Sequence, residues 1–287
     1  MDSRLSSYKP FLYTISMQYT LLDSGNQNKL EQFGDYVLVR PCAQAVWKPV
    51  LEEKDWKEAD AIFTREPSNR WVASPPLPNS WTVECEEVLF KVMPTDFGHI
   101  GIFPEHALLW KWMKQKMQKK CSILNLFAYT GGATLAAAKA GADVCHVDAS
   151  KTTVAWAREN AALNKLEKAP IRWIVDDAIK FLGREVRRGV RYDGIILDPP
   201  TFGRGSQGEV FKIEKDLPVI LDLCFQLLTP NPQFVILSSH TPGYTPLVLH
   251  HLLLQAKGVR KGTIEMGEMV IPGPLDLTSG TYARWYA

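Results

Sequence analysis

The chain has 287 residues, of which 46% are hydrophobic and 22% charged, and its formal net charge is +2 at pH 7. This length allows one large domain or two small ones, and this charge neither demands nor excludes a nucleic-acid partner. No apolar run reaches the roughly 18 to 20 residues of a membrane span, and the first residues lack a secretory layout, so we expect no membrane partner and a cytoplasmic location.

The first part of the chain, residues 1–106, is rich in aromatics and prolines. Short β-like runs such as Tyr36–Arg40 and Val88–Val92 are separated by proline-rich breaks, which is typical of short strands and turns. We therefore predict a small β-rich N-terminal module. Residues 107–120 follow as an amphipathic linking helix, with apolar residues at helical spacing from Leu109 onward.

From residue 122 the pattern alternates between apolar strand-like runs and helical stretches. The predicted strands are Ile123–Phe127, Val144–Asp148, Ile171–Asp176, Gly194–Asp198 and Gln233–Ser238, and the predicted helices are Ala133–Ala140, Lys151–Asn164, Ala178–Arg187, Glu214–Leu228 and Pro246–Lys257. Such alternation indicates an α/β fold, a doubly wound Rossmann-like parallel sheet with helices on both faces. Residues 107–287 are the predicted second domain. Ligands of such sheets bind beyond the carboxyl ends of the strands.

Cysteines and basic runs give weaker signals. The five cysteines form no C-x-x-C pair, so we expect small buried side chains and no metal site. Two basic runs, Lys111–Lys120 and Arg184–Arg191, are either nucleic-acid contacts or the solvated faces of helices.

A small-residue turn follows the first strand of the second domain. It reads Tyr129-Thr130-Gly131-Gly132-Ala133-Thr134. Glycine allows a positive φ and a close approach of backbone to a ligand, and the N-terminus of the next helix favours an anionic group. The turn does not match G-x-G-x-x-G, so the dinucleotide fingerprint fails. A plain tight turn between strand and helix is an equally good interpretation.

Acidic residues follow the second and third strands. Asp148 is placed to accept hydrogen bonds from the hydroxyls of a ribose, and an aspartate of the Asp176-Asp177 pair to accept one from an adenine amino group. Each position also suits a helix N-cap, which Ser150 could equally supply before the helix at Lys151.

The fourth strand is followed by Asp198-Pro199-Pro200-Thr201-Phe202. Two prolines fix φ and forbid helix, so the chain is held extended and presents Asp198 in a fixed direction. Phe202 lies where a flat ring can stack on a base. Together the four strand ends suit S-adenosylmethionine and an adjacent planar substrate.

These residues resemble class I S-adenosylmethionine-dependent methyltransferases, and more narrowly the ribosomal-RNA family with large-subunit cytosine-C5 and guanine-N7 enzymes. The resemblance rests on NLFAYTGG, VDAS, WARENAALN, DDAIKFL and ILDPPTFGRG, which lie between residues 122 and 240, and on FGHIGIFPEH before them. It implies that the cofactor is S-adenosylmethionine, released as S-adenosylhomocysteine. The implied cofactor-binding residues are Phe127, Tyr129, Thr130, Gly131, Gly132, Thr134, Asp148, Ala149, Ser150, Asp177, Ala178 and Asp198. The implied catalytic residues are Asp198, Pro199, Pro200 and Phe202.

One departure from the family concerns the nucleophile. Cytosine-C5 members resemble one another in a cysteine after the fifth strand, where this chain reads Ser238-Ser239-His240. Because C5 methylation needs such a nucleophile, transfer to a ring or exocyclic nitrogen fits better. We expect an enzyme acting on RNA, with rRNA as the expected partner. The alternatives are a methyltransferase acting on protein or a small molecule, a nicotinamide-dependent dehydrogenase, and a non-catalytic nucleotide-binding module.

Overall fold

The computed structural model of the protein describes residues 18–118, 120–204 and 210–287. Predictions that concern residues 1–17, Lys119 or Gly205 therefore fall outside the described residues. Within the described ranges, every helix is too short or too polar to cross a lipid bilayer.

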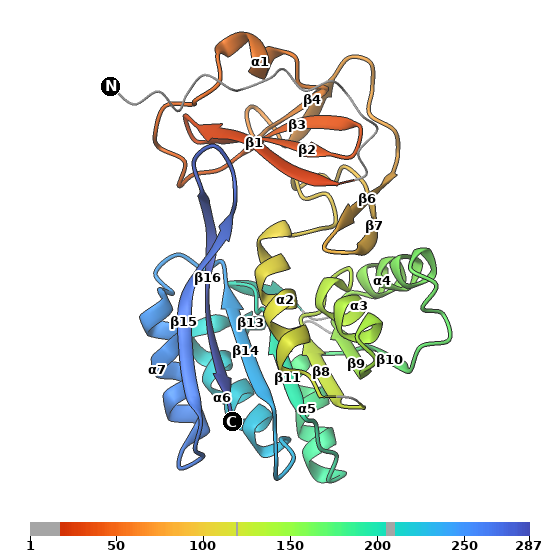
Figure 1. Ribbon diagram of the computed structural model, residues 1–287, viewed down its shortest axis with the longest axis vertical. Helices are drawn as coiled ribbons and strands as arrows, with labels where there is room; N and C mark the ends of the chain where they lie inside the picture. The colour runs from red at the N-terminus through yellow and green to blue at the C-terminus, as the bar shows by residue number, and fades with distance from the viewer. Residues whose placement is uncertain (1–17, 119, 205–209) are drawn as a thin grey trace.

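A five-stranded sheet forms most of the N-terminal module (Figure 1), as the β-like runs predicted. Its strands are β1 (Tyr19–Gly25), β2 (Asn28–Phe33), β3 (Tyr36–Pro41), β4 (Ala61–Thr64) and β5 (Arg70–Ala73), in that spatial order, with α1 (Glu53–Lys57) between β3 and β4. A buried ion pair fixes this sheet: Arg40 donates from Nε and Nη2 to the Glu31 carboxylate at 2.7 and 2.9 Å. Removing one partner of such a pair costs far more than the pair contributes, because a buried charge is left uncompensated.

The hairpin of β6 (Trp81–Cys85) and β7 (Val88–Val92) packs on the second part of the chain. Its backbone bonds to side chains of α4 (Lys151–Leu163): the Asn164 amide pairs with both backbone groups of Leu89, and Asn160 accepts from the Lys91 N–H. After it, the 3₁₀ turn η1 (Pro104–His106) leads directly into α2 (Ala107–Lys116). The helix α2 buries Trp110 and Met113 against the sheet domain, so it is part of that core as well as a link.

The large sheet has seven strands in the order β10-β9-β8-β11-β14-β16-β15. The first five, all mutually parallel, are the predicted strands: β10 (Ile171–Val175), β9 (Asp143–Asp148), β8 (Ser122–Leu126), β11 (Gly194–Leu197) and β14 (Phe234–Ser239). Chain order reverses between β8 and β11. A crevice therefore opens at their carboxyl ends, because the connections leave in opposite directions there.

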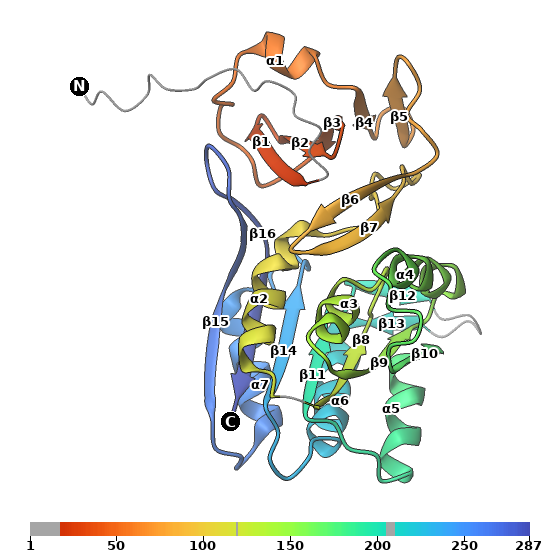
Figure 2. The same ribbon diagram turned by 45° about the vertical axis from the view of Figure 1, so that its right-hand side comes forward.

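Helices cover both faces of this sheet, as the predicted doubly wound fold requires (Figure 2). They are α3 (Gly132–Lys139), α4, α5 (Ala178–Arg187), α6 (Ile213–Gln226) and α7 (Pro246–Lys257). Alternate residues of one strand serve opposite faces: Ile123 packs in the core under α2 and α3, and Leu124 in the core under α5 and α6. This two-residue period is the property of extended chain that the apolar runs encode.

The sequence did not predict the last two strands or the small hairpin after β11. The strand β16 (Leu277–Tyr286) pairs in antiparallel fashion with β14 on one side and with β15 (Thr263–Ile271) on the other. The strand β12 (Phe202–Arg204) pairs with β13 (Val210–Lys212). The sheet is therefore mixed rather than wholly parallel.

The tip of the β15–β16 hairpin reaches the N-terminal sheet in both ribbon views (Figures 1 and 2). Ile271 and Leu277 are buried there against Leu21 and Cys42. In addition, the Gln44 side chain donates to the Thr278 carbonyl at 2.8 Å. The N-terminal sheet and the C-terminal hairpin are thus joined across a small apolar contact.

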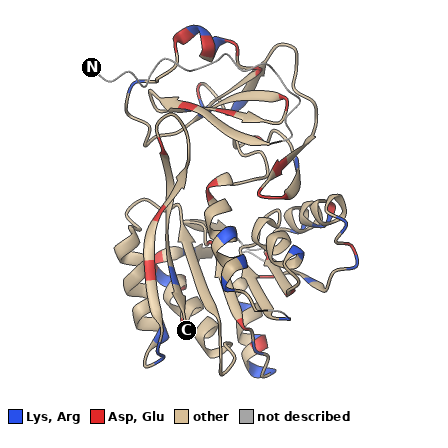
Figure 3. Cartoon of the chain, in the orientation of Figure 1, with Lys and Arg blue, Asp and Glu red and all other residues tan. Residues whose placement is uncertain are grey.

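All five cysteines are free and buried, as expected. The basic runs are paired with acids: Lys111 with Glu86, and Lys114 with Glu87, on the exposed side of α2 (Figure 3). In the second run, Arg184 pairs with Asp176. This pairing favours the interpretation of both runs as solvated helix faces.

We predict that Leu277→Ala lowers the free energy of unfolding by about 2–5 kcal/mol, because it removes a fully buried side chain from the contact between hairpin and module. Leu275→Ala on the same hairpin is the matched control, since that side chain is 43% exposed, and its effect is expected within about 0.5 kcal/mol. Urea denaturation measures both. Equal losses in the two variants would contradict the anchoring role.

Candidate functional site

A cleft of about 1190 Å³ lies where the carboxyl ends of the parallel strands meet the N-terminal module. Ten of the predicted site residues line it. They are Phe127, Tyr129, Asp148, Ala149, Ser150, Asp177, Ala178, Asp198, Pro199 and Pro200. Strand ends that are far apart in the sequence are therefore brought to one hollow, as the sheet topology predicts.

The turn after β8 has an unusual backbone. Phe127 and Tyr129 adopt left-handed φ angles of 53° and 49°, and Gly131 one of 96°. Left-handed backbone is uncommon outside glycine and is often found at functional sites. Both Phe127 and Tyr129 line the cleft, so the strained residues are the ones that face a ligand.

The two glycines of this turn allow close packing, and Gly131 has the positive φ that the sequence predicted. A Cβ on Gly132 would lie 2.4 Å from the Trp110 ring, and one on Gly131 would lie 3.3 Å from Ala157 Cβ. The absence of side chains at these glycines permits α2 and α4 to pack closely on the turn. Neither glycine lines the cleft. Gly132 and Thr130 instead line a smaller neighbouring cavity of about 80 Å³.

Thr130 and Thr134 are also turned away from the cleft. The Thr130 hydroxyl donates to the Gly101 carbonyl at 2.5 Å, and the fully buried Thr134 hydroxyl contacts Asn125 and His146 at 3.0 Å each. Both hydroxyls therefore hold the turn in place, and a direct contact of Thr134 with a cofactor is not supported by its position.

Asp148 lies at the end of β9 with each carboxylate oxygen bound once. Oδ2 accepts from the Tyr129 N–H and Oδ1 from the Ser150 N–H, both at 2.9 Å. Burial raises the pKa of Asp148 above its ordinary value, and the two N–H groups offset part of that rise. Because a carboxylate oxygen has two lone pairs, each oxygen retains one for a ligand hydroxyl.

Two aspartates follow β10, and their roles differ. Asp177 is the N-cap of α5, with Oδ1 accepting from the Lys180 N–H at 2.9 Å. Its neighbour Asp176 is committed to an ion pair with Arg184. Asp177 therefore performs the N-cap role weighed in the sequence and also faces the cleft, where its second oxygen suits an amino group.

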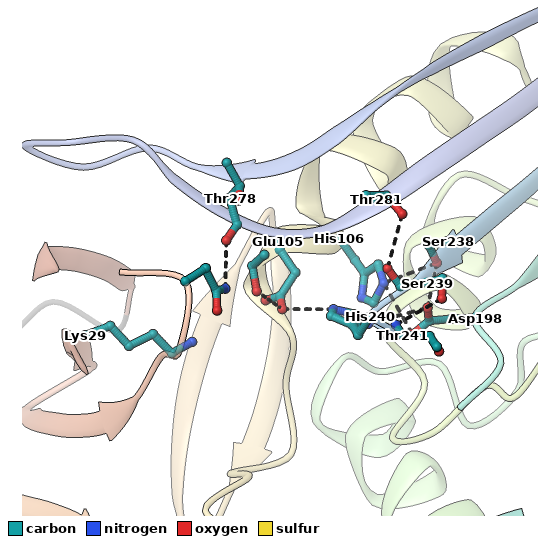
Figure 4. Close-up of polar contacts among 12 residues, drawn as sticks. Lys29, Glu105, His106, Asp198, Ser238, Ser239, His240, Thr241, Thr278 and Thr281 are labelled. Atoms are coloured by element: carbon teal, nitrogen blue, oxygen red, sulfur yellow. Dashed lines mark hydrogen bonds and ion pairs between the residues drawn. The ribbon is translucent and has the colours of Figure 1, made fainter. Parts of the chain in front are cut away.

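The carboxylate of Asp198 is held by three side chains (Figure 4). Ser238 donates to Oδ1 at 2.8 Å, His106 Nε2 lies 3.4 Å from Oδ2, and His240 Nδ1 lies 3.7 Å from Oδ1. Asp198 was predicted to face the target base. The structure shows that its carboxylate also organises the residues around it.

His240 extends from the end of β14 between two carboxylates (Figure 4). Its Nε2 lies 3.1 Å from Oε1 of the buried Glu105, the same oxygen that accepts from the Ser279 hydroxyl at 2.7 Å. Asp198 lies on its other side. We call Glu105, His240 and Asp198 the ionic clamp, which joins η1, β14 and the end of β11.

The three ionisations of the clamp support one another. Burial alone would raise the pKa of Asp198 and Glu105, but the neighbouring histidines, and for Glu105 also Lys29, outweigh it and hold both carboxyls well below their usual range. Burial would lower the pKa of His240, but hydrogen bonds and charge from Asp198 and Glu105 raise it to about 10. At neutral pH the clamp is therefore an imidazolium between two carboxylates.

His106, Asp198 and His240 each offer a metal-ligand atom, and these atoms lie within 4.8 Å of one another. A protonated imidazole has no free lone pair for a metal. A metal at these atoms would therefore require His240 to lose its proton.

Other residues of the cleft were not predicted. Phe211 lines the cleft and packs on Phe127 with ring centroids 5.4 Å apart, whereas the predicted Phe202 is 51% exposed on β12, outside the lining. Glu105 and His106 lie in the segment FPEH that the resemblance already marked, so that motif was their only signal. The N-terminal module also lines the cleft, partly through the segment 97–106 that the resemblance marked and partly through residues of β2, β3 and β4 that no motif indicated.

The residues present fit S-adenosylmethionine. Asp148 has open lone pairs for a ribose, and Asp177 has one open oxygen for an adenine amino group. The cleft wall there is acidic, which suits a molecule that carries a sulfonium cation.

The described geometry agrees with three kinds of similarity. Residues 60–252 match the model of a family described as S-adenosylmethionine-dependent methyltransferase. The protein named Ribosomal RNA large subunit methyltransferase K/L is 36% identical over 149 residues in Shewanella sp. strain ANA-3 and 41% identical over 144 residues in Syntrophotalea carbinolica. These alignments cover 51% and 50% of this chain, and the chain spans about a fifth of the relatives, at 21% and 20% of their lengths.

Solved structures resemble almost the whole chain. The SAM-dependent methyltransferase from Agrobacterium tumefaciens is 41% identical, with a TM-score of 0.91 over 94% of this chain and 90% of that one. A methyltransferase from Streptococcus mutans has a TM-score of 0.78 at 19% identity, covering 96% of this chain and 76% of that one, and shows the fold alone.

We predict that Asp148→Ala weakens binding of S-adenosylhomocysteine by roughly 2–4 kcal/mol, because two charge-assisted hydrogen bonds to the ribose are lost. Isothermal titration calorimetry measures this. Asp143→Ala, at the exposed opposite end of β9, is the matched control and should leave the affinity unchanged. An Asp148→Ala variant that melts like the wild type and binds normally would refute the ribose role.

We predict that the clamp adds a pH-dependent part to stability. The pKa of His240 is raised from 6.5 to about 10. The contribution of its ionisation to the free energy of unfolding is therefore fully present below about pH 6.5 and is lost as the pH rises through 10. In a His240→Gln variant it is absent. The free energies of unfolding of the wild type and the variant, measured with urea between pH 6 and 10, should therefore approach each other at high pH. Parallel curves would show that the clamp is not charged in the folded state.

Proposed function

Because the chain belongs to the S-adenosylmethionine-dependent methyltransferase family, we propose that it methylates a base of ribosomal RNA. The family membership confirms the predicted fold class, enzyme class and cofactor. The RNA substrate is supported by the K/L relatives, whose printed name is an rRNA large-subunit methyltransferase. An rRNA substrate would also agree with the cytoplasmic location expected from the sequence.

The observation that carries this proposal is the size of the cleft relative to the cofactor. Sites for one small molecule usually enclose about 300–1,000 Å³, and this cleft encloses about 1190 Å³. It continues from the cofactor residues Asp148 and Asp177 past Asp198 to the N-terminal module. An acceptor base can therefore lie in the same hollow as the methyl donor.

The segment from Asp198 to Pro200 is the proposed edge against which the base lies. Pro199 is buried and holds the turn in place, whereas Pro200 is exposed and accessible to a ligand. The Asp198 oxygens already have Ser238 and the two histidines as partners, which favours a backbone carbonyl of the Pro-Pro segment as the acceptor for a base amino group. Phe202 keeps its predicted stacking role as a proposal.

The acceptor atom is a nitrogen rather than a carbon in this proposal. Addition to C5 of a pyrimidine needs a reactive thiolate or equally strong nucleophile. Ser239 is 1% exposed and accepts from the Thr241 N–H at 3.1 Å. Cys42 is the one cysteine in the cleft lining, but it is 5% exposed, lies in the N-terminal module, and burial raises its pKa.

Catalysis would rest on positioning. S-adenosylmethionine supplies an electrophilic methyl group on a sulfonium sulfur. Asp148 and Asp177 would fix the donor, the Asp198–Pro200 edge would fix the base, and the two would meet in one enclosed hollow. Holding reactants in line in this way accounts for a large share of many enzymatic rate enhancements.

We predict methyl transfer from labelled S-adenosylmethionine to large-subunit rRNA from cells that lack the protein, with the label on a base nitrogen. Scintillation counting before and after ribonuclease, and mass spectrometry of the nucleosides, measure this. Label that stays with protein or a small molecule after nuclease treatment would replace rRNA by one of those substrates.

Two substitutions test whether the methylated atom is a nitrogen rather than C5 of a pyrimidine. Cys42→Ser and Ser239→Ala should each retain transfer within a few-fold, because neither side chain forms a bond to the base. Loss of transfer in one folded variant, together with a C5-methylated product, would restore the carbon mechanism.

A further inference from the structure

The two walls of the cleft carry opposite charge. On the strand-end wall, the aspartates Asp148, Asp176, Asp177 and Asp198 outnumber the cations, which are Lys151 and the protonated His240. On the N-terminal wall, the charged residues from the module's five strands and their loops that line the cleft are all cations: Lys29, Arg40 and Arg65. A cationic cofactor and a polyanionic substrate would each be attracted to a different wall.

The cations of the N-terminal wall are only partly neutralised. Glu31 is buried behind them and binds both Arg40, at 2.7 Å, and Lys29, at 3.1 Å. The side chain of Lys29 points along the cleft toward Glu105 (Figure 4). Arg65 is exposed, and among the described residues no carboxylate forms an ion pair with it. The single carboxylate of Glu31 is thus shared by two cations, and Arg65 is a third cation on the same wall.

Phe97 presents an aromatic ring at the rim of the same wall. Its side chain lines the cleft and is 73% exposed. It lies in a turn closed by hydrogen bonds from the Thr95 N–H to the His99 carbonyl and from the Gly98 N–H to the Thr95 carbonyl, each 3.0 Å long. The ring is therefore exposed by a well-ordered turn rather than by a loose loop.

Three further contacts hold this turn against the module. The Arg40 guanidinium donates to the Gly98 carbonyl at 3.1 Å, and the Trp71 indole N–H donates to the Thr95 carbonyl at 3.0 Å. Gly98 has a φ of 77°, and a Cβ there would lie 2.6 Å from the Phe63 ring. Because these contacts fix the backbone of the turn, the position of Phe97 is pre-organised in the absence of a ligand.

Aromatic rings continue from this turn to the ionic clamp. His99 and Phe103 lie 5.3 Å apart between ring centroids, and Phe103 lies 5.5 Å from His240 and 5.3 Å from Tyr129. All four rings line the cleft. A row of flat surfaces beside Arg65 and the partly neutralised Lys29 suits a nucleotide chain, in which bases stack and phosphates bind cations.

We propose, resting on the proposed RNA substrate, that Phe97, Arg65 and Lys29 form a nucleotide subsite on the N-terminal module. Phe97 stacks on a base beside the target nucleotide, and Arg65 and Lys29 bind its phosphates. The module is thereby the part of the enzyme that orients single-stranded RNA across the cleft toward the Asp198–Pro200 edge.

Two variants test the subsite through the KM for rRNA at several salt concentrations. Phe97→Ala should raise KM about ten-fold or more, as expected when one base loses its stacking partner, and Phe97→Tyr should restore it. Arg65→Gln should reduce the slope of log affinity against log salt by about 0.7, the value for one phosphate contact to a single strand. Both should bind S-adenosylhomocysteine like the wild type.

The matched controls lie on β5 of the same module. Val72→Ala and Arg70→Gln remove an exposed apolar side chain and an exposed guanidinium outside the cleft lining, and should change neither KM nor slope. If the wild type methylates rRNA and Phe97→Ala and Arg65→Gln match it in KM and slope, the subsite is wrong and the proposed function stands. If the wild type transfers nothing to rRNA, both proposals fail.

Discussion

The site depends on one electrostatic arrangement, the imidazolium of His240 between Glu105 and Asp198. Each of the two carboxylates is buried enough to be costly when unpaired, and the shared cation makes both ionisations favourable. The clamp also connects three separate segments, because Glu105 precedes α2, Asp198 follows β11 and His240 follows β14. The rigid edge at Pro199 and Pro200 is therefore positioned by charge as well as by proline geometry.

The clamp extends into the C-terminal hairpin through Ser279, which donates to the same oxygen of Glu105 that faces His240. Two residues before Ser279, the hairpin packs on the N-terminal sheet at Leu277. The two walls of the cleft are thus fixed relative to each other by the hairpin and by the segment leading into η1. These two connections explain how the N-terminal module comes to face the strand ends.

Sequence patterns predicted the parallel strands and their helices because each strand alternates between two apolar cores, as Ile123 and Leu124 do. They also placed Asp148, Asp177 and Asp198 at one edge, since topology alone brings strand ends together. They could not predict β15 and β16, whose residues are partly exposed and lack a continuous apolar run. Nor could they assign Thr134 or Gly132, because packing against His146 and Trp110 depends on tertiary contacts far along the chain.

The two serines at the end of β14 support the ionic clamp and the segment that follows it. Ser238 donates to Asp198 and Ser239 accepts from the Thr241 backbone, so both hydroxyls support the geometry of the edge. Each hydroxyl thus has a structural partner, whereas addition to C5 of a pyrimidine requires a stronger nucleophile than an unassisted serine. The proposed transfer to a nitrogen needs no such covalent addition, because in that proposal the acceptor atom attacks the methyl group directly.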